Sequence, residues 1–154
     1  MTLTLKYSLL NSAMGLIVGL LVLGMATGDG YFMFPIAAAM AAFVTGGLFW
    51  KIINGNSKDL KTPRVILTGI LTGSISHYVC WILVSAGMNI CYLTTGKCTD
   101  SFGGPPASVA SMLIGSFAFT FFSLLFFGWL TIPVSTAIGL FLKFRQKNKN
   151  VQQL

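Results

Sequence analysis

The chain of 154 residues is strongly apolar and basic, with 55% hydrophobic residues, 8% charged residues and a formal net charge of +7. A soluble domain of this length has too little interior for so much apolar surface, so the composition excludes an ordinary globular protein and favours an integral membrane protein. The basic residues stand at the ends of apolar runs and follow no helix face, so they do not indicate nucleic-acid binding.

Nine of the ten basic residues form three clusters, each at the end of a long apolar run. If the runs cross a bilayer, one threading places every cluster in the cytoplasm, with both termini cytoplasmic. We therefore predict an all-α protein of the cell inner (plasma) membrane, with four transmembrane helices in an up-down bundle that forms a single integral domain, residues 1–154. At the clusters we expect anionic lipid head groups. The clusters are Lys6; Lys51, Lys58, Lys61 and Arg64; and Lys143, Arg145, Lys147 and Lys149.

The first two predicted spans, residues 8–27 and 31–50, each have about the 20 residues that a bilayer core requires. A short turn joins them, so we expect an antiparallel hairpin. A cleaved signal peptide is the alternative for the first run, since a lysine precedes it and small residues end it. In the second span, Ala38, Ala42 and Gly46 recur every four residues. Such a stripe of small residues lets helix backbones approach closely in lipid.

The third predicted span, residues 65–92, carries a polar face. Hydroxyl residues recur there every four positions, and two glycines followed by the only histidine form the neighbouring stripe. Two interpretations stay open: a water-filled path or ligand site, or a packing face whose hydroxyls bond to the preceding turn. The residues of the polar face are Thr68, Thr72, Ser76 and His77, and the glycines are Gly69 and Gly73.

The sequence places His77 near the middle of the third span, about 19 Å from its start. An ionisable residue at that depth is a functional candidate. A relay of protons needs a second titrating group, however, and the three acidic residues, Asp29, Asp59 and Asp100, all fall in predicted loops. A hydrogen-bonded packing role for His77 is the alternative.

The predicted outer loop, residues 94–107, is the longest segment outside the membrane, and an outside partner would meet it first. Cys91 and Cys98 flank its start, so a small disulfide in an oxidising compartment and two unpaired thiols are both open. Cys80 falls inside an apolar run and is expected to be a buried apolar residue.

The last apolar stretch, residues 108–142, is about 52 Å long if wholly helical, which exceeds one crossing. Two crossings would move the densest basic cluster outside. We predict a fourth span over residues 108–129, a break near Pro133, an amphipathic segment over residues 133–144 along the inner interface and a polar tail, residues 146–154. A kinked continuation of the span is the alternative.

The sequence contains no recognisable catalytic set, no cofactor-binding motif and no metal-ligand cluster, so we predict a protein that is not an enzyme and has no cofactor. We expect it to act through helix or loop contacts with another membrane protein or with itself. An immunity or exclusion protein, or an accessory subunit, would have this size and threading. The alternative is a small homo-oligomeric channel or transporter whose path is lined by the polar face.

Overall fold

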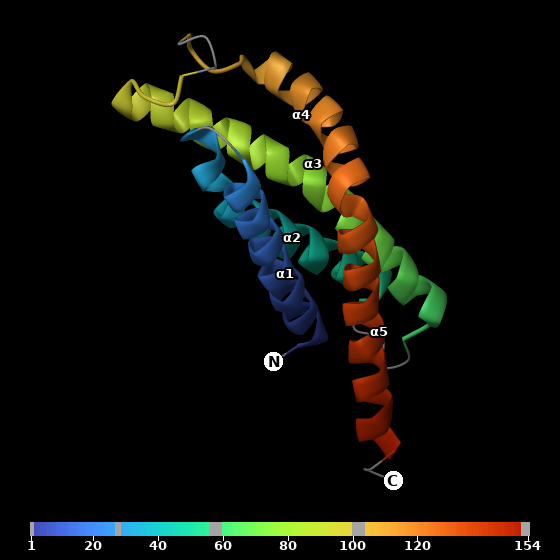
Figure 1. The fold of residues 1–154 in the computed structure, drawn as a ribbon. Helices are drawn as coiled ribbons and strands as arrows, with labels where there is room; N and C mark the ends of the chain where they lie inside the picture. Colours follow the sequence, from blue (N-terminus) through green and yellow to red (C-terminus); the bar gives the residue numbers. More distant parts are fainter. Residues whose placement is uncertain (1, 27–28, 56–59, 100–103, 152–154) are drawn as a thin grey trace.

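A computed structural model of the chain describes residues 2–26, 29–55, 60–99 and 104–151, in which no strand occurs (Figure 1). Four helices are long and apolar enough to cross a membrane, which confirms the predicted all-α class and the number of such helices. The elements are α1 (Leu3–Met25), the 3-10 helix η1 (Asp29–Met33), α2 (Phe34–Ile53), α3 (Thr62–Thr95), α4 (Val109–Ser123), the π-helical turn η2 (Leu124–Gly128) and α5 (Trp129–Val151). Lys58, Asp59 and Asp100 lie outside the described residues.

Helices α1 and α2 form a hairpin whose backbones nearly touch. A Cβ added to Gly15 would lie 2.5 Å from the carbonyl oxygen of Ala38, and one added to Gly19 would lie 2.6 Å from the Cα of Pro35. Dispersion falls off steeply with separation, so this approach supplies packing energy that lipid cannot supply through the hydrophobic effect. The Ala38 and Ala42 stripe of α2 therefore meets Gly15 of α1, and the first residues of α2 meet Gly19.

Helices α3 and α5 cross at a second close approach. A Cβ on Gly69 would lie 2.5 Å from the Cα of Thr136, and one on Gly73 would lie 2.7 Å from the Cα of Ile132. The two glycines are one helical turn apart, and so are the two residues that they face. Only glycine leaves room for the α5 backbone at this crossing.

One cluster of apolar side chains brings together the ends of all four long helices that carry the basic residues. The Tyr7 ring of α1 lies 4.6 Å from that of Trp50 of α2, centroid to centroid. Both pack with Leu60, with Val65 of α3 and with Leu142 of α5 in one buried cluster. The described Lys and Arg residues other than Lys97 belong to these ends of the helices. We call this part of the molecule the basic end.

At the opposite end, four aromatic rings form a row across η1, α2, α3 and α4. Tyr31 of η1 lies 5.6 Å from Phe34 of α2, Phe34 lies 4.8 Å from Trp81 of α3, and Trp81 lies 4.7 Å from Phe119 of α4. Offset and edge-on ring pairs at such distances add to the packing energy. The row links the hairpin to α3, and α3 to α4. We call this part of the molecule the disulfide end, because Cys91 and Cys98 lie there.

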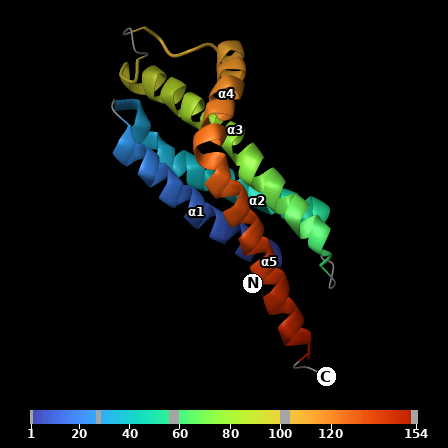
Figure 2. The same cartoon turned by 45° about the vertical axis from the view of Figure 1, so that its right-hand side comes forward.

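The segment expected to follow a break at Pro133 is instead part of one continuous helix, Val109–Asn148. Figures 1 and 2 show this helix crossing α3 and running on to the C-terminus. Its small and polar side faces inward, with Ser135 and Gly139 buried, while Phe141 and Phe144 are exposed. The expected amphipathic face exists, but its polar side packs on the bundle because small residues permit close helix contact. Of the two predicted alternatives, the kinked continuation of the span therefore agrees better with this continuous helix.

Polar side chains are buried and large apolar side chains are exposed more than in a soluble protein. Buried positions include Asn11, Thr45, Thr68, Thr72 and Ser135, whereas large apolar side chains are exposed along every long helix. A soluble domain avoids apolar patches of that extent. Polar groups inside and apolar groups outside are what a bilayer solvent favours.

Candidate functional site

The polar face of α3 is directed into the helix packing, and its members have separate partners. Thr68 is fully buried; its hydroxyl donates to the carbonyl oxygen of Arg64 at 2.8 Å and accepts from Nδ2 of Asn54 at 2.8 Å. Ser76 donates to the carbonyl oxygen of Gly73 at 3.4 Å. Thr68 is thus engaged with the end of α2, away from the histidine, and the structure does not gather the whole face at one site.

His77 is held by hydroxyls on both sides of the π-helical turn η2. Its Nδ1 lies 2.6 Å from Oγ of Ser123, and its Nε2 lies 2.9 Å from Oγ1 of Thr131. Oγ1 of Thr131 also lies within 3.4 Å of the carbonyl oxygen of Gly73, to which it can only donate. Thr131 then accepts from Nε2–H, and Ser123 donates to Nδ1. A neutral imidazole is satisfied at both nitrogens in this arrangement.

The π-helical turn accounts for this two-sided contact. An extra residue in a turn widens the helix and shifts the side chains that follow it. Pro133 lies just beyond and has no N–H to donate, so the backbone here departs from a regular ladder. Gly128, the last residue of η2, is buried, with its added Cβ only 3.3 Å from a Leu124 methyl carbon. Sequence reasoning identified Pro133 but not the partners of His77.

A small cavity of about 60 Å³ lies between the four long helices, beside His77. Thr72 and Ser76 line it together with Asn11, Thr131 and Ser135. Thr72 is 1% exposed, and its hydroxyl makes no hydrogen bond of normal geometry, although it lies near the Tyr7 hydroxyl. The space fits one or two water molecules and no larger solute.

A polar link between the first and last helices was missed by sequence reasoning. Oγ of Ser135 donates to Oδ1 of Asn11, and Nδ2 of Asn11 donates to the carbonyl oxygen of Tyr7 at 2.9 Å. The Tyr7 hydroxyl donates to the carbonyl oxygen of Ser135 at 3.3 Å. An asparagine inside an apolar run was the available signal, because a buried amide in lipid requires partners.

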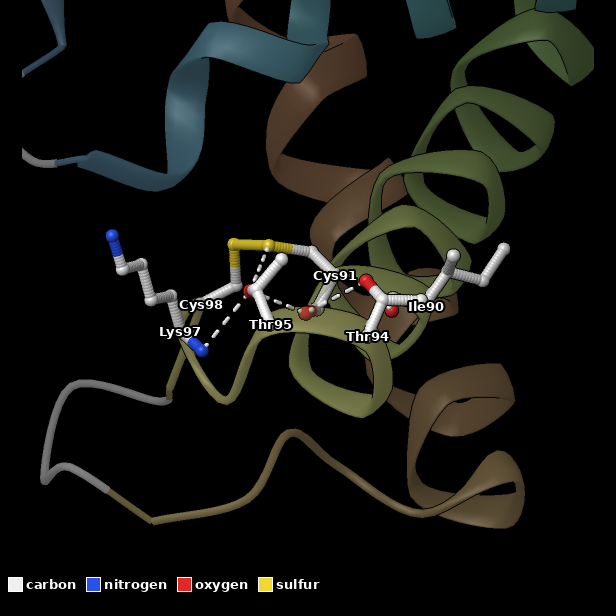
Figure 3. The surroundings of a disulfide bond; sticks show 6 residues. All are labelled: Ile90, Cys91, Thr94, Thr95, Lys97 and Cys98. Carbon is white, nitrogen blue, oxygen red and sulfur yellow. Dashed lines mark hydrogen bonds between the residues drawn. A yellow bond between two sulfur atoms is a disulfide. The ribbon is translucent and has the colours of Figure 1, made fainter.

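A disulfide joins Cys91, near the end of α3, to Cys98, which follows that helix, with their Cα atoms 5.9 Å apart. Figure 3 shows how the chain turns back around it. Gly96 has φ of +68°, which glycine adopts without strain, and the Lys97 N–H donates to Oγ1 of Thr95 at 3.1 Å. Cys80 is a free, buried cysteine, far from this bond in sequence.

A larger groove of about 310 Å³ lies at the disulfide end, between η1, α3, α4 and the segment that precedes α4. The aromatic row forms much of its wall, and Ser85 and Asn89 are its polar side chains. Nδ2 of Asn89 donates to the carbonyl oxygen of Ser85 at 2.9 Å and contacts that of Ala107 at 3.4 Å. The groove has the proportions of a small ligand pocket.

Two polar sites therefore result, a small one at His77 and a larger one at Asn89. Within the described ranges, no three His, Cys, Asp or Glu side chains come together as metal ligands would. Hydroxyl side chains contact both nitrogens of His77, and no carboxylate of the described residues bonds to it. No protein-family model, curated protein or solved structure matches this chain.

Proposed function

We propose that the chain is a non-enzymatic, multi-pass protein of the cell inner membrane that acts through contacts of its helices and its disulfide loop with another membrane component. One observation carries the proposal: three interior polar residues, His77, Thr68 and Asn11, are used in joining the helices. Both nitrogens of His77 are engaged, Thr68 is fully buried, and Asn11 bonds to Ser135. An interior occupied in this way leaves the outer faces and the loop for function.

Two independent features support a threading with both termini in the cytoplasm. Lys and Arg gather at the basic end, as they do on the cytoplasmic side of membrane proteins. The Cys91–Cys98 disulfide lies at the other end, and disulfides persist on the oxidising side of a membrane. The same threading brings the basic clusters to anionic lipid head groups.

The least covered helix is the best candidate for partner contact. Only Ser116 of α4 is buried, and Phe117 is 74% exposed on its outer side. Helix α4 packs on α3 but not on the hairpin. An immunity or exclusion protein, which meets a molecule inserted in the same membrane, would use such a face, and so would an accessory subunit of a complex.

Photocrosslinking in native membranes tests this proposal. A benzophenone amino acid in place of Phe117 should give a discrete crosslinked product. The matched control replaces Phe43, an exposed phenylalanine of α2. Equal, diffuse crosslinking to lipid at both positions would refute contact through α4.

A channel or transporter is the second candidate, favoured by the polar cavity beside His77 with its unsatisfied Thr72 hydroxyl. A path of this kind would need several copies, because the cavity holds only one or two waters. Reconstituted liposomes should show no solute flux under the first proposal. Flux that falls on Thr72→Val and on His77→Ala would establish the second.

A further inference from the structure

The groove at the disulfide end has a chemistry that distinguishes it from a gap filled by lipid. Its wall is largely aromatic, with Tyr31, Trp81 and Phe119 presenting rings in the row described above. The groove between α1 and α2 differs in its lining, which is mainly aliphatic, with Phe43 as its one aromatic ring and Ser12 as its polar side chain. Aromatic walls favour a flat aromatic occupant through stacking and edge contacts.

Asn89 adds a hydrogen-bond acceptor to this aromatic wall. Both partners of its amide are backbone carbonyl oxygens, those of Ser85 and Ala107, and a carbonyl only accepts. The amide nitrogen must therefore face them, which fixes the orientation of the side chain. Its Oδ1 accepts no hydrogen bond from any described residue. An occupant of the groove can satisfy this oxygen only by donating.

We propose that the groove receives the indole side chain of a tryptophan on a membrane-inserted polypeptide, with the indole N–H donating to Oδ1 of Asn89. Indole is a large aromatic group that donates and does not accept, so it matches both the wall and the free oxygen. Tryptophan also concentrates at membrane interfaces and dominates the energy of protein contacts. The inference rests on the proposed function, since it specifies the chemistry of the membrane partner.

The depth of the groove fits this occupant. It is lined by Pro106 and Ala107, which precede α4, and by residues in the half of α3 nearest the disulfide. In the proposed threading this level is the outer interface, where the tryptophan belt of a membrane-inserted helix lies. The groove is also large enough for one bicyclic ring, at the lower limit of typical ligand pockets.

Binding of 5-fluoroindole to the full chain in phospholipid nanodiscs tests the proposal, with ¹⁹F line broadening as the readout and empty nanodiscs as the baseline. We expect saturable broadening with the wild-type protein. Asn89→Leu should weaken binding about 2- to 12-fold, the range for one lost hydrogen bond. Asn148→Leu makes the same change at an exposed position of α5 and should leave binding unaltered. Ala107→Trp, outside the helices, should fill the groove and abolish binding.

Two synthetic Leu-Ala transmembrane peptides, one with Trp and one with Phe at its ends, then identify the source of the aromatic group. The Trp peptide should displace 5-fluoroindole, and the Phe peptide should not. Displacement by both would show that apolar packing alone fills the groove. Equal broadening by wild type and Asn89→Leu, or by wild type and Ala107→Trp, would also overturn the proposal.

Quenching of tryptophan fluorescence by lipids with brominated acyl chains tests whether lipid fills the groove. Trp129 is 73% exposed and should be strongly quenched by them, whereas Trp81 should be protected by the groove and its occupant. Equal quenching of both in single-tryptophan variants would mean that lipid chains fill the groove, which would refute the inference. If indole does not bind but Phe117 still crosslinks, only this inference fails. If indole binds but no partner crosslinks, the proposed function fails.

Discussion

Replacing Gly73 with alanine should weaken the protein through one steric contact. The added Cβ would lie 2.7 Å from the Cα of Ile132 and 3.0 Å from its N, both backbone atoms that no rotamer change can move. Carbon atoms prefer separations of about 3.5–4.0 Å, so α3 and α5 must part by about 1 Å. Overpacking of this kind costs about 1–3 kcal/mol.

Gly115 offers a matched control for the helix propensity of alanine. Its added Cβ would have Phe119 as its nearest neighbour, at an ordinary 3.9 Å. Both replacements raise the helix propensity by the same amount, up to about 1 kcal/mol in water. The difference between the stabilities of the two variants therefore isolates the steric contact. Gly73→Ala should therefore be less stable than Gly115→Ala by about 1–3 kcal/mol.

Steric trapping in bicelles measures this free energy of unfolding directly. The same samples should lose the contacts of His77, which follows Gly73 by one turn on the same stripe of α3. If the two alanine variants have equal stability, the close crossing of α3 and α5 does not exist as described.

Three further predictions concern the polar contacts and the threading. His77→Ala should destabilise the fold by about 1–2 kcal/mol by removing two interhelical hydrogen bonds, and His77→Gln should recover part of this in the same unfolding assay. Asn11→Leu should cost about 0.5–1.5 kcal/mol through the lost bond between α1 and α5, whereas Ser12→Ala should change stability by less than about 0.5 kcal/mol; equal effects would contradict the link. In intact cells, an impermeant maleimide should label Pro105→Cys but not Lys61→Cys, and the reverse pattern would invert the threading.

Periodicity in the sequence was sufficient to predict the helices and the crowded face of α3. Gly69, Gly73 and His77 recur at a spacing that puts them on one side of a helix whatever surrounds it. The pattern did not identify what that side meets. The partners of His77 lie on another helix, on either side of an irregular turn, and no periodicity within α3 encodes them.

The expectation of a break near Pro133 has a physical origin. The last apolar run is longer than a bilayer is thick and contains Pro133, so a break and an interfacial segment were expected. The structure accommodates the excess length in a continuous helix containing a π-helical turn. Ser135 and Gly139 looked like a water-facing side, but small and polar residues in a membrane protein belong between helices.

The bond between Asn11 and Ser135 bears on the order in which the protein assembles. Asn11 and Ser135 are 124 positions apart in the sequence, so the ribosome adds Asn11 long before it adds Ser135. Under the proposed threading, the amide oxygen of Asn11 lies in the membrane without its partner until α5 is made, so α1 to α4 form an incomplete intermediate. A chain that stops before α5 leaves that intermediate permanent, and membrane quality-control proteases would degrade it.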